Sequence, residues 1–535
     1  MLTKNKIKTL TGAQLIIETL KNLGVNTVFG YPGGVVLDIY DVLYNEKSIK
    51  HILTRHEQSA VHAAEGYARE TGKCGVVIVT SGPGATNTVS GIVNAYLDGY
   101  PLVVLTGQVS ADLIGKDAFQ EADICNIVKS CTKKTFQISS ANEIKETLYE
   151  AFRIANSGKK GPVIVDLIKD IFKQEVKTAE FSTLNITTEY RQPDVSNLVK
   201  ALLNSEKPLI VAGGGVNHSE AEDELYRFVT EHNIPVVSTM MGLGAFPQSN
   251  PNYLGMIGIF GDISANKAIS EADLVISLGA RFNDRITCRD ELNGKLFQID
   301  INPKEISRII PTDSYIAGDI KNVLTLTEFN KTFDDWMRAA LSLKNLNKEQ
   351  KRTTNLMHSF EVLREIEDFT KEQNITFTSE VGQHQLWAVR NLRFNKDRKI
   401  FVSGGSGTMG FGFPAAIGAS VASPSKTVVC ITGDGSFQMG LHELATCKDY
   451  GLNVKIIILN NGYLGMVRQL QEKQCNRRYS QTKISNPDFV TLAKSYGIDA
   501  LRVTNSKEIR NALQTAFATD KTFVLDFAVE PMETL

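Results

Sequence analysis

The chain has 535 residues, and its 58 basic and 59 acidic side chains give a formal charge of −1. This balance argues against a surface for nucleic acid or anionic membrane, while 42% hydrophobic and 22% charged residues are ordinary for a globular protein. A chain of this length favours about three domains.

Seven cysteines are scattered without a CxxC pair, which predicts reduced thiols and no zinc site. The N-terminus lacks the apolar core of a signal peptide, and no apolar run approaches the ~20 residues of a membrane span. We therefore expect a cytoplasmic protein with no nucleic-acid or membrane partner.

The first predicted domain, residues 1–172, alternates short apolar segments with helical patterns, which predicts a parallel sheet covered by helices. The predicted strands are 27–29, 52–53, 75–80, 102–105 and 163–165. A strand-poor stretch, 171–194, follows this domain.

Two polar motifs follow strands of the first domain. Glu57 precedes an Ala-rich helix, and one interpretation is that its carboxylate only stabilises the positive end of that helix. Residues 80–87 form a Gly/Pro turn between a strand and a helix, which in isolation indicates no more than a plain connecting loop.

The second predicted domain, residues 193–332, again alternates strands and helices. Its predicted strands are 208–212, 236–237, 274–278 and 296–301. Gly213 and Gly214 follow the first of these strands, and acidic residues at later strand ends, such as Asp300, with Asp319 further along the chain, suit a dinucleotide site. Residues 333–357 are helical and then polar, and they predict a linker to the third domain.

The third predicted domain, residues 358–535, contains the most informative pair of motifs. Asp434 follows the apolar strand 427–431, and Asn461 follows the apolar strand 454–459. If these strands are parallel neighbours, both side chains lie at the same edge of the sheet and offer oxygen ligands to Mg²⁺. The glycines beside Asp434 allow the backbone to approach a diphosphate closely.

This pair resembles the motif with which thiamine-diphosphate enzymes bind their cofactor. Other segments match one family of these enzymes in order: 31–34, 55–58, 80–87, 117–121, 279–285, 381–385, 407–410 and 464–469. The chain resembles the catalytic subunits of the acetohydroxyacid synthase (acetolactate synthase) family, in its FAD-containing branch. The resemblance implies three doubly wound α/β domains, which are pyrimidine-binding, FAD-binding-like and diphosphate-binding, in that order along the chain.

The resemblance also implies roles for individual residues. In the reaction itself, Glu57 would bond the cofactor's pyrimidine ring, Arg285 would bind the acceptor's carboxylate, and the remaining candidates are Phe119, Gln120 and Lys169. The implied metal ligands are Asp434, Asn461 and the carbonyl of Tyr463. The implied contacts with thiamine diphosphate are Gln383, His384, Gly407, Met409, Gly435, Ser436 and Met466. The implied FAD contacts are Gly213, Gly214, Asp284, Asp300, Ile301 and Asp319. The substrate channel would contain Gly33, Val35, Ser110 and Leu470.

Simpler interpretations remain for two of these residues. Met409 also suits a core position, because methionine is a common filler of irregular gaps. Arg285 also suits a surface or interdomain ion pair.

The implied reaction is the decarboxylation of pyruvate and its ligation to a second 2-ketoacid, in branched-chain amino acid biosynthesis. The resemblance further implies Mg²⁺ and thiamine diphosphate as cofactors, FAD in a structural role, and active sites between chains of a homodimer or tetramer. A small regulatory subunit is common in the family. The alternatives are a related 2-ketoacid decarboxylase, oxidase or carboligase with another acceptor, and a paralogue that binds nucleotide without catalysis.

The chain departs from the family at several of these positions. Leu470 replaces a usual Trp, while Val35 and Ser110 replace a usual Ala and Pro in the channel. Lys159 and Phe260 replace a usual Arg and His near the flavin, which makes FAD less secure than thiamine diphosphate.

Leu470 generates a prediction about the acceptor. The family's Trp favours 2-ketobutyrate over pyruvate by contacting its extra methylene, a contact worth roughly 1–3 kcal/mol. We expect a weaker preference for 2-ketobutyrate in this chain and relatively more acetolactate. Competition of the two acceptors with the purified enzyme measures this, and a strong preference for 2-ketobutyrate would contradict it.

Overall fold

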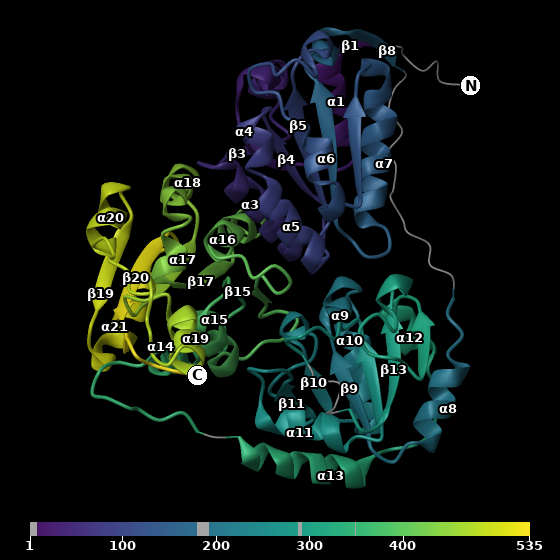
Figure 1. The fold of residues 1–535 in the computed structure, drawn as a ribbon, viewed down its shortest axis with the longest axis vertical. Coiled ribbons are helices and arrows are strands. Elements are labelled where there is room, and N and C mark those ends of the chain that lie inside the picture. The colour runs from purple at the N-terminus through teal and green to yellow at the C-terminus, as the bar shows by residue number, and fades with distance from the viewer. Residues whose placement is uncertain (1–7, 179–191, 287–291, 348) are drawn as a thin grey trace.

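The computed structural model describes residues 8–178, 192–286, 292–347 and 349–535. It contains three six-stranded sheets whose strands are all parallel, each with helices on its faces. In Figure 1 the first sheet lies at the top, the second at the lower right and the third at the lower left. This confirms the predicted fold class of three doubly wound α/β domains. The domain boundaries 1–172, 193–332 and 358–535 stay a prediction.

The first sheet is built from the predicted apolar strands and one further edge strand. Its strands are β2 (Thr27–Tyr31), β3 (Lys50–Leu53), β4 (Gly75–Val79), β5 (Leu102–Gln108), β6 (Lys134–Ile138) and β7 (Pro162–Ile168), in the order β3-β2-β4-β5-β7-β6. Its helices are α1 (Gly12–Asn22), α2 (Leu37–Asn45), α3 (Glu57–Thr71), α4 (Pro83–Thr86), α5 (Val89–Asp98), α6 (Ile124–Ile127) and α7 (Ile144–Asn156). Helices cover both faces, so the central strands β4, β5 and β7 are buried along their whole length.

The stretch predicted to be strand-poor contains one short strand. β8 (Glu175–Thr178) pairs antiparallel with β1 (Lys8–Thr11) and joins the two ends of the first domain. β8 has alternating exposure and four residues, so only its pairing with β1 distinguishes it from a loop. Most of the stretch, residues 179–191, lies outside the described residues.

The second sheet has the order β11-β10-β9-β12-β13-β14. The strands are β9 (Pro208–Ala212), β10 (Val236–Ser238), β11 (Tyr253–Met256), β12 (Leu274–Leu278), β13 (Lys295–Asp300) and β14 (Ser314–Ala317). The helices are α8 (Ser196–Asn204), α9 (Gly214–His218), α10 (Glu222–His232), α11 (Ile263–Glu271), α12 (Ile320–Leu326) and α13 (Asp334–Ser342). The chain order reverses between β9 and β12, and doubly wound sheets bind ligands at such a point.

The segment predicted as the second linker, residues 333–357, begins as part of this domain. Helix α13 buries Trp336 and Met337 in the core of the second sheet, and Trp336 Nε1 donates a hydrogen bond to the carbonyl of Pro208, 2.9 Å away. Figure 1 shows α13 along the lower edge of this domain. The interpretation as a linker is therefore wrong for α13, because its apolar face finds a partner that is distant in sequence.

The third sheet has the order β16-β15-β17-β18-β20-β19. The strands are β15 (Ile375–Thr378), β16 (Ile400–Phe401), β17 (Thr427–Gly433), β18 (Val454–Asn460), β19 (Asp499–Val503) and β20 (Phe523–Ala528). The helices are α14 (Ser359–Thr370), α15 (Gln383–Asn391), α16 (Gly412–Ala422), α17 (Asp434–Phe437), α18 (Leu444–Tyr450), α19 (Gly465–Gln474), α20 (Phe489–Ser495) and α21 (Ile509–Phe517). β17 and β18 are adjacent, as predicted from their apolar runs.

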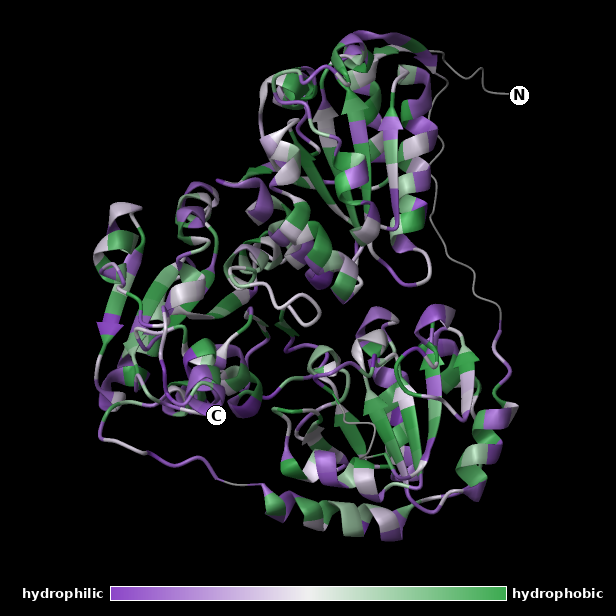
Figure 2. Ribbon diagram, in the orientation of Figure 1, coloured by the Kyte–Doolittle hydropathy of each residue, from purple (hydrophilic) through white to green (hydrophobic). Residues whose placement is uncertain are grey.

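Two helices join the first and third domains into one hydrophobic core. Helix α16 is buried from Gly412 to Val421, and it packs along α3. The close approach depends on two glycines: a Cβ on Gly66 would overlap the backbone of Ala415, and a Cβ on Gly418 would overlap the backbone of Ala63. In Figure 2 the strands are mostly hydrophobic, while outer helices such as α7 alternate hydrophobic and hydrophilic residues.

No helix among the residues described in the structure is long and apolar enough to cross a membrane.

The glycine contacts predict that Gly66→Ala and Gly418→Ala lower stability by about 1–3 kcal/mol, because the added methyl groups force α3 and α16 apart. Alanine alone favours a helix by about 1 kcal/mol over glycine, so any loss of stability in these variants must come from the contact between the helices. The melting temperature of each variant measures this loss.

The matched control is Gly318→Ala, whose added methyl group would find its nearest neighbours at an ordinary 3.5 Å. We expect this variant to melt within a degree or two of the parent, since the added methyl group would make only ordinary van der Waals contacts. Melting of both helix variants at or above the parental temperature would contradict this account of the packing.

Candidate active site and interdomain cavity

The predicted site residues of the first domain lie at one edge of its sheet. Strands of a parallel sheet end at a common edge, where doubly wound folds bind ligands. The residues that follow strand ends here are Gly33 after β2, Glu57 after β3, Thr80 to Gly84 after β4, Ser110 after β5 and Lys169 after β7.

Glu57 is the first residue of α3, but it does not cap the helix. The capping residue is His56, whose Nδ1 accepts a hydrogen bond from the amide of Gln58 at 3.1 Å. The Glu57 carboxylate instead accepts one from Asn87 Nδ2 at 3.0 Å. Asn87 lies within the predicted Gly/Pro turn, although no role was expected for it from the sequence. The turn and the carboxylate thus form one polar cluster.

The same turn brings further candidates together. A Cβ on Gly33 would overlap the side chain of Thr80, and a Cβ on Gly82 would lie 2.8 Å from the Cα of Gln120. Gln120 itself has φ +60°, a left-handed conformation that non-glycine residues rarely adopt. Its neighbour Phe119 is 89% exposed.

The channel candidates of this domain lie beside the cluster. A Cβ on Gly107, near the end of β5, would lie 2.8 Å from a methyl group of Val35. Ser110 begins the short turn that follows β5, and Lys169 is exposed at the end of β7.

Asp434 and Asn461 meet at the corresponding edge of the third sheet. The Asp434 carboxylate is buried, and its Oδ2 accepts hydrogen bonds from the amide of Gly462 at 2.8 Å and from Asn486 Nδ2 at 2.7 Å. Asn461 Oδ1 accepts one from the amide of Tyr463 at 3.0 Å. Burial raises the pKa of Asp434. Asn486 is a participant that the sequence did not reveal.

A metal site here would depend on one carboxylate with amide and carbonyl oxygens. No group of three or more His, Cys, Asp or Glu side chains suited to a metal occurs in the part of the chain that the structure describes. Asp434, Asn461 and the Tyr463 carbonyl are all oxygen donors, as Mg²⁺ requires, and Mg²⁺ commonly completes its shell with phosphate oxygens and water.

His384 indicates that this edge is built for a polar ligand. Its ring is mostly buried, and its Nε2 makes no hydrogen bond within the described protein, although the Glu380 carboxylate lies 3.3 Å away. Two glycines make room for it: a Cβ on Gly433 would lie 2.7 Å from the ring, and one on Gly382 would lie 2.8 Å from it. A buried polar atom without a hydrogen bond is costly, so a bound polar group beside His384 fits these residues.

Other residues of the third domain that are predicted to contact the cofactor have different neighbours. Gln383 is buried and already bonded, since its Nε2 donates to Gln469 Oε1 at 2.7 Å. Ser436 is buried in α17. The Met409 methyl group would lie 3.9 Å from a Cβ on Gly435, so Met409 reaches the glycine beside Asp434 from an irregular segment.

A cavity of about 540 Å³ lies where the three domains meet. It opens at the reversal point of the second sheet, where Gly213 after β9 approaches the backbone of Gly279 after β12. Its lining contains nearly all predicted FAD contacts and several thiamine and substrate contacts: Gly214, Asp284, Asp300, Ile301, Asp319, Gly407, Met466, Arg285 and Leu470. Lys159 and Phe260, the two departures near the flavin, line it as well.

The chemistry of this lining suits an anionic dinucleotide. Lys159, Lys160 and Arg281 supply positive charge, while burial raises the pKa of Asp300, at the end of β13, to about 6. Asp319 caps α12 by accepting from the amide of Asn322 at 3.1 Å.

Arg285 lies at the mouth of the cavity in an exposed position. Its side chain is 68% exposed, and its Nε lies 3.3 Å from the adjacent Asp284 carboxylate. An ion pair this exposed contributes little stability, so the pair leaves Arg285 available to a ligand. Leu470 of α19 is 41% exposed at the same cavity.

The two polar edges lie apart within one chain. Figure 1 shows α4, which follows β4, on the opposite side of the packed helices α3 and α16 from α17, which begins at Asp434. The predicted channel residues divide in the same way, with Gly33, Val35 and Ser110 at the first edge and Leu470 at the cavity.

Comparison with known proteins shows the family to which this chain belongs. Residues 10–127, 195–327 and 380–527 match the family models described as thiamine pyrophosphate enzyme, N-terminal TPP binding domain, central domain and C-terminal TPP binding domain. The acetolactate synthase large subunit of Haemophilus influenzae is 42% identical over 98% of this chain and 96% of its own length. That of Lactococcus lactis is 43% identical over 95% and 90%. The acetolactate synthase isozyme 2 large subunit of Escherichia coli is 39% identical over 98% and 96%.

The matched domains, each centred on one of the three sheets, define a thiamine pyrophosphate enzyme. Within this class, the chain belongs to the acetolactate synthase large-subunit family. The family, the thiamine diphosphate cofactor and the enzyme class expected from the sequence, a thiamine-dependent acetolactate synthase, are confirmed.

Proposed function

We propose that this chain joins pyruvate to a second 2-ketoacid at an active site shared between two copies. The observation that supports this is that Glu57 follows a strand of the first sheet, whereas Asp434 and Asn461 follow strands of the third. One copy would provide the Glu57 edge and the other would provide the Asp434 edge.

Exposed apolar side chains support the pairing of copies. They occur on segments that follow β2 and β5, namely Leu37, Leu113, Ile114 and Phe119. Apolar groups gathered beside a polar site are typical of a buried interface, and homodimers with closed symmetry are the commonest assemblies. The choice between dimer and tetramer stays a prediction.

At the Asp434 edge, Asp434, Asn461 and the Tyr463 carbonyl would hold Mg²⁺, and His384, Gly435 and Ser436 would contact the diphosphate. Met409 would support the bent cofactor, while Gln383, Gly407 and Met466 would contact it from the surrounding segments. His384 Nε2 makes no hydrogen bond within the described protein, although the Glu380 carboxylate lies 3.3 Å away, and a bound polar group that supplied one would support this assignment.

At the Glu57 edge, Glu57 would bond the pyrimidine ring and exchange a proton with it through its carboxylate. The bond from Asn87 fixes one carboxylate oxygen and leaves the other available for this purpose. Thiamine diphosphate, when bound, supplies a carbon nucleophile and an electron sink for the decarboxylation of pyruvate.

The substrate residues would come from both edges. Phe119, Gln120 and Lys169 would face the first ketoacid beside Gly33, Val35 and Ser110, and Arg285 would bind the carboxylate of the acceptor through its planar guanidinium. A closed interface excludes water, which would otherwise compete by protonating the reacting carbon.

FAD would occupy the cavity between the domains, with Gly213, Gly214, Asp284, Asp300, Ile301 and Asp319 around it. The ligation involves no net oxidation, so we assign the flavin a structural role. Relatives of this chain are named large subunits, and we propose a small subunit as a partner. The cytoplasmic location expected from the sequence also stays a prediction.

Acetolactate formation from pyruvate, with and without thiamine diphosphate and Mg²⁺, tests the function. We expect activity only with both, and a loss of at least about 100-fold in Glu57→Gln, because positioned acid–base groups contribute 100-fold or more. Glu143→Gln, an exposed carboxylate of the same domain, is the matched control and should retain activity.

Three results would contradict the proposal. Acetaldehyde as the main product would favour the related decarboxylase, and full activity of Glu57→Gln would remove the assigned role of this carboxylate. Binding of the cofactors without any product would favour the non-catalytic paralogue.

A further inference from the structure

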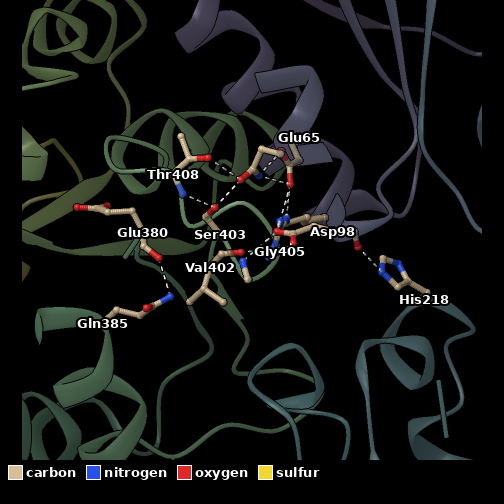
Figure 3. Close-up of polar contacts among 12 residues, drawn as sticks. Glu65, Asp98, His218, Glu380, Gln385, Val402, Ser403, Gly405 and Thr408 are labelled. Atoms are coloured by element: carbon tan, nitrogen blue, oxygen red, sulfur yellow. Dashed lines mark hydrogen bonds and ion pairs between the residues drawn. The ribbon is translucent and has the colours of Figure 1, made fainter. Parts of the chain in front are cut away.

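One buried aspartate of the first domain contacts all three domains. Asp98 ends α5, and its carboxylate accepts hydrogen bonds from Arg69 Nη2 at 2.7 Å and from the amides of Gly404 at 3.2 Å and Gly405 at 2.7 Å. Its backbone carbonyl lies 3.0 Å from His218 Nε2 of the second domain. Figure 3 shows these contacts converging on Asp98.

The His218 contact does not depend on charge. Burial lowers the pKa of His218 to about 3, so its ring is neutral near pH 7 and its Nε2–H can donate to the Asp98 carbonyl. His218 ends α9, the helix that begins at the candidate flavin contact Gly214.

Asp98 is part of a network that fixes residues 402–408 of the third domain, which form neither helix nor strand. Arg69 Nη1 donates to the Val402 carbonyl at 3.0 Å, and Ser403 Oγ donates to Asn94 Oδ1. The amide of Thr408 in turn donates to Ser403 Oγ at 2.7 Å. Both ends of this segment are therefore held by side chains of α3 and α5 (Figure 3).

The remainder of the network is buried and rigid. Asn94 Nδ2 donates to both carboxylate oxygens of Glu65, at 3.1 and 2.9 Å, and Arg69 pairs with Glu65 as well as with Asp98. The Arg69 guanidinium lies over the ring of Tyr100, 4.1 Å from its centre. Bonds between charged groups in such surroundings are strong and directional.

The 402–408 segment connects the two candidate cofactor sites. Asp98, Gly404, Gly405 and Gly407 line the interdomain cavity together with His218. Directly after the segment, Met409 reaches Gly435 beside Asp434. A glycine-rich backbone has many accessible conformations, so its geometry at both sites depends on the groups that hold it.

We propose that Asp98 is a positioning residue that couples the two sites, so that occupancy of the cavity orders the 402–408 segment and strengthens cofactor binding at Asp434. This inference rests on the proposed function, which assigns FAD to the cavity and thiamine diphosphate to the Asp434 edge. Coupling of binding free energies is reciprocal, so each ligand must strengthen the other by the same factor.

The test measures that factor with the full-length protein freed of both cofactors. FAD is titrated by flavin fluorescence with and without saturating Mg²⁺–thiamine diphosphate, and Mg²⁺–thiamine diphosphate is titrated by calorimetry with and without FAD. We expect each cofactor to tighten the other about 10-fold, within the usual range for coupled sites. In Asp98→Asn the factor should fall to about 1, because the amide nitrogen of Asn cannot accept from Arg69 or from the glycine amides.

Asp166→Asn is the matched control. Asp166 is equally buried in the first domain, and its carboxylate accepts from Thr106, Gln108 and Gln137 rather than from the 402–408 segment. A purely structural role for Asp98 would lower the melting temperature of both variants and leave the coupling factor unchanged in both. Ser403→Ala, which removes the bond to Thr408 with a smaller disturbance, should also reduce the factor and serves if Asp98→Asn does not fold.

The outcomes separate the inference from the proposed function. The parent protein can bind both cofactors with coupling while Asp98→Asn keeps the full coupling factor. That result overturns the inference and leaves the cofactor assignment intact, and the same holds for Ser403→Ala if Asp98→Asn does not fold. Binding of both cofactors by the parent without coupling also overturns the inference and leaves the cofactor assignment intact. A parent that binds no FAD overturns the cavity assignment and the inference together.

Discussion

The contact between α3 and α16 is the interaction on which the rest of the structure depends. It is possible only because Gly66 and Gly418 allow the two helix backbones to approach each other. Helix α3 begins at Glu57 and contains Glu65 and Arg69, while α16 follows the 402–408 segment and Met409. One helix pair therefore sets the position of the candidate acid–base group and of the segment that reaches the other edge.

The chemistry of the site follows from how parallel sheets end. Each sheet presents its loops at a single edge, and the first and third sheets carry complementary halves: a carboxylate with a Gly/Pro turn on one, and oxygen ligands with a buried imidazole on the other. These halves belong to separate sheets of one chain. A second copy is the simplest way to bring them together, and the exposed apolar side chains beside Glu57 are consistent with this.

The sequence predicted central strands such as β4, β17 and β18 well, because their apolar runs are buried on both sides. It missed edge strands such as β6, β14 and β19, whose exposure is mixed and whose existence depends on a neighbouring strand. It also treated α13 as linker, since its partner Pro208 is distant in the chain. Among site residues, motifs revealed Glu57 and Asp434, whereas Asn87, Asn486 and Asp98 act through contacts that no local pattern records.

The most direct test of the shared site is complementation between two inactive variants, Glu57→Gln and Asp434→Ala. When the two proteins are unfolded together, refolded and supplied with cofactors, random pairing makes about half of the dimers hybrid, each with one site that has both residues intact. A shared site predicts recovery of about a quarter of parental activity in the mixture, and none when either variant is refolded alone. No recovery in a mixture shown to contain hybrid dimers would contradict it, because a site contained within one chain cannot be restored by its partner.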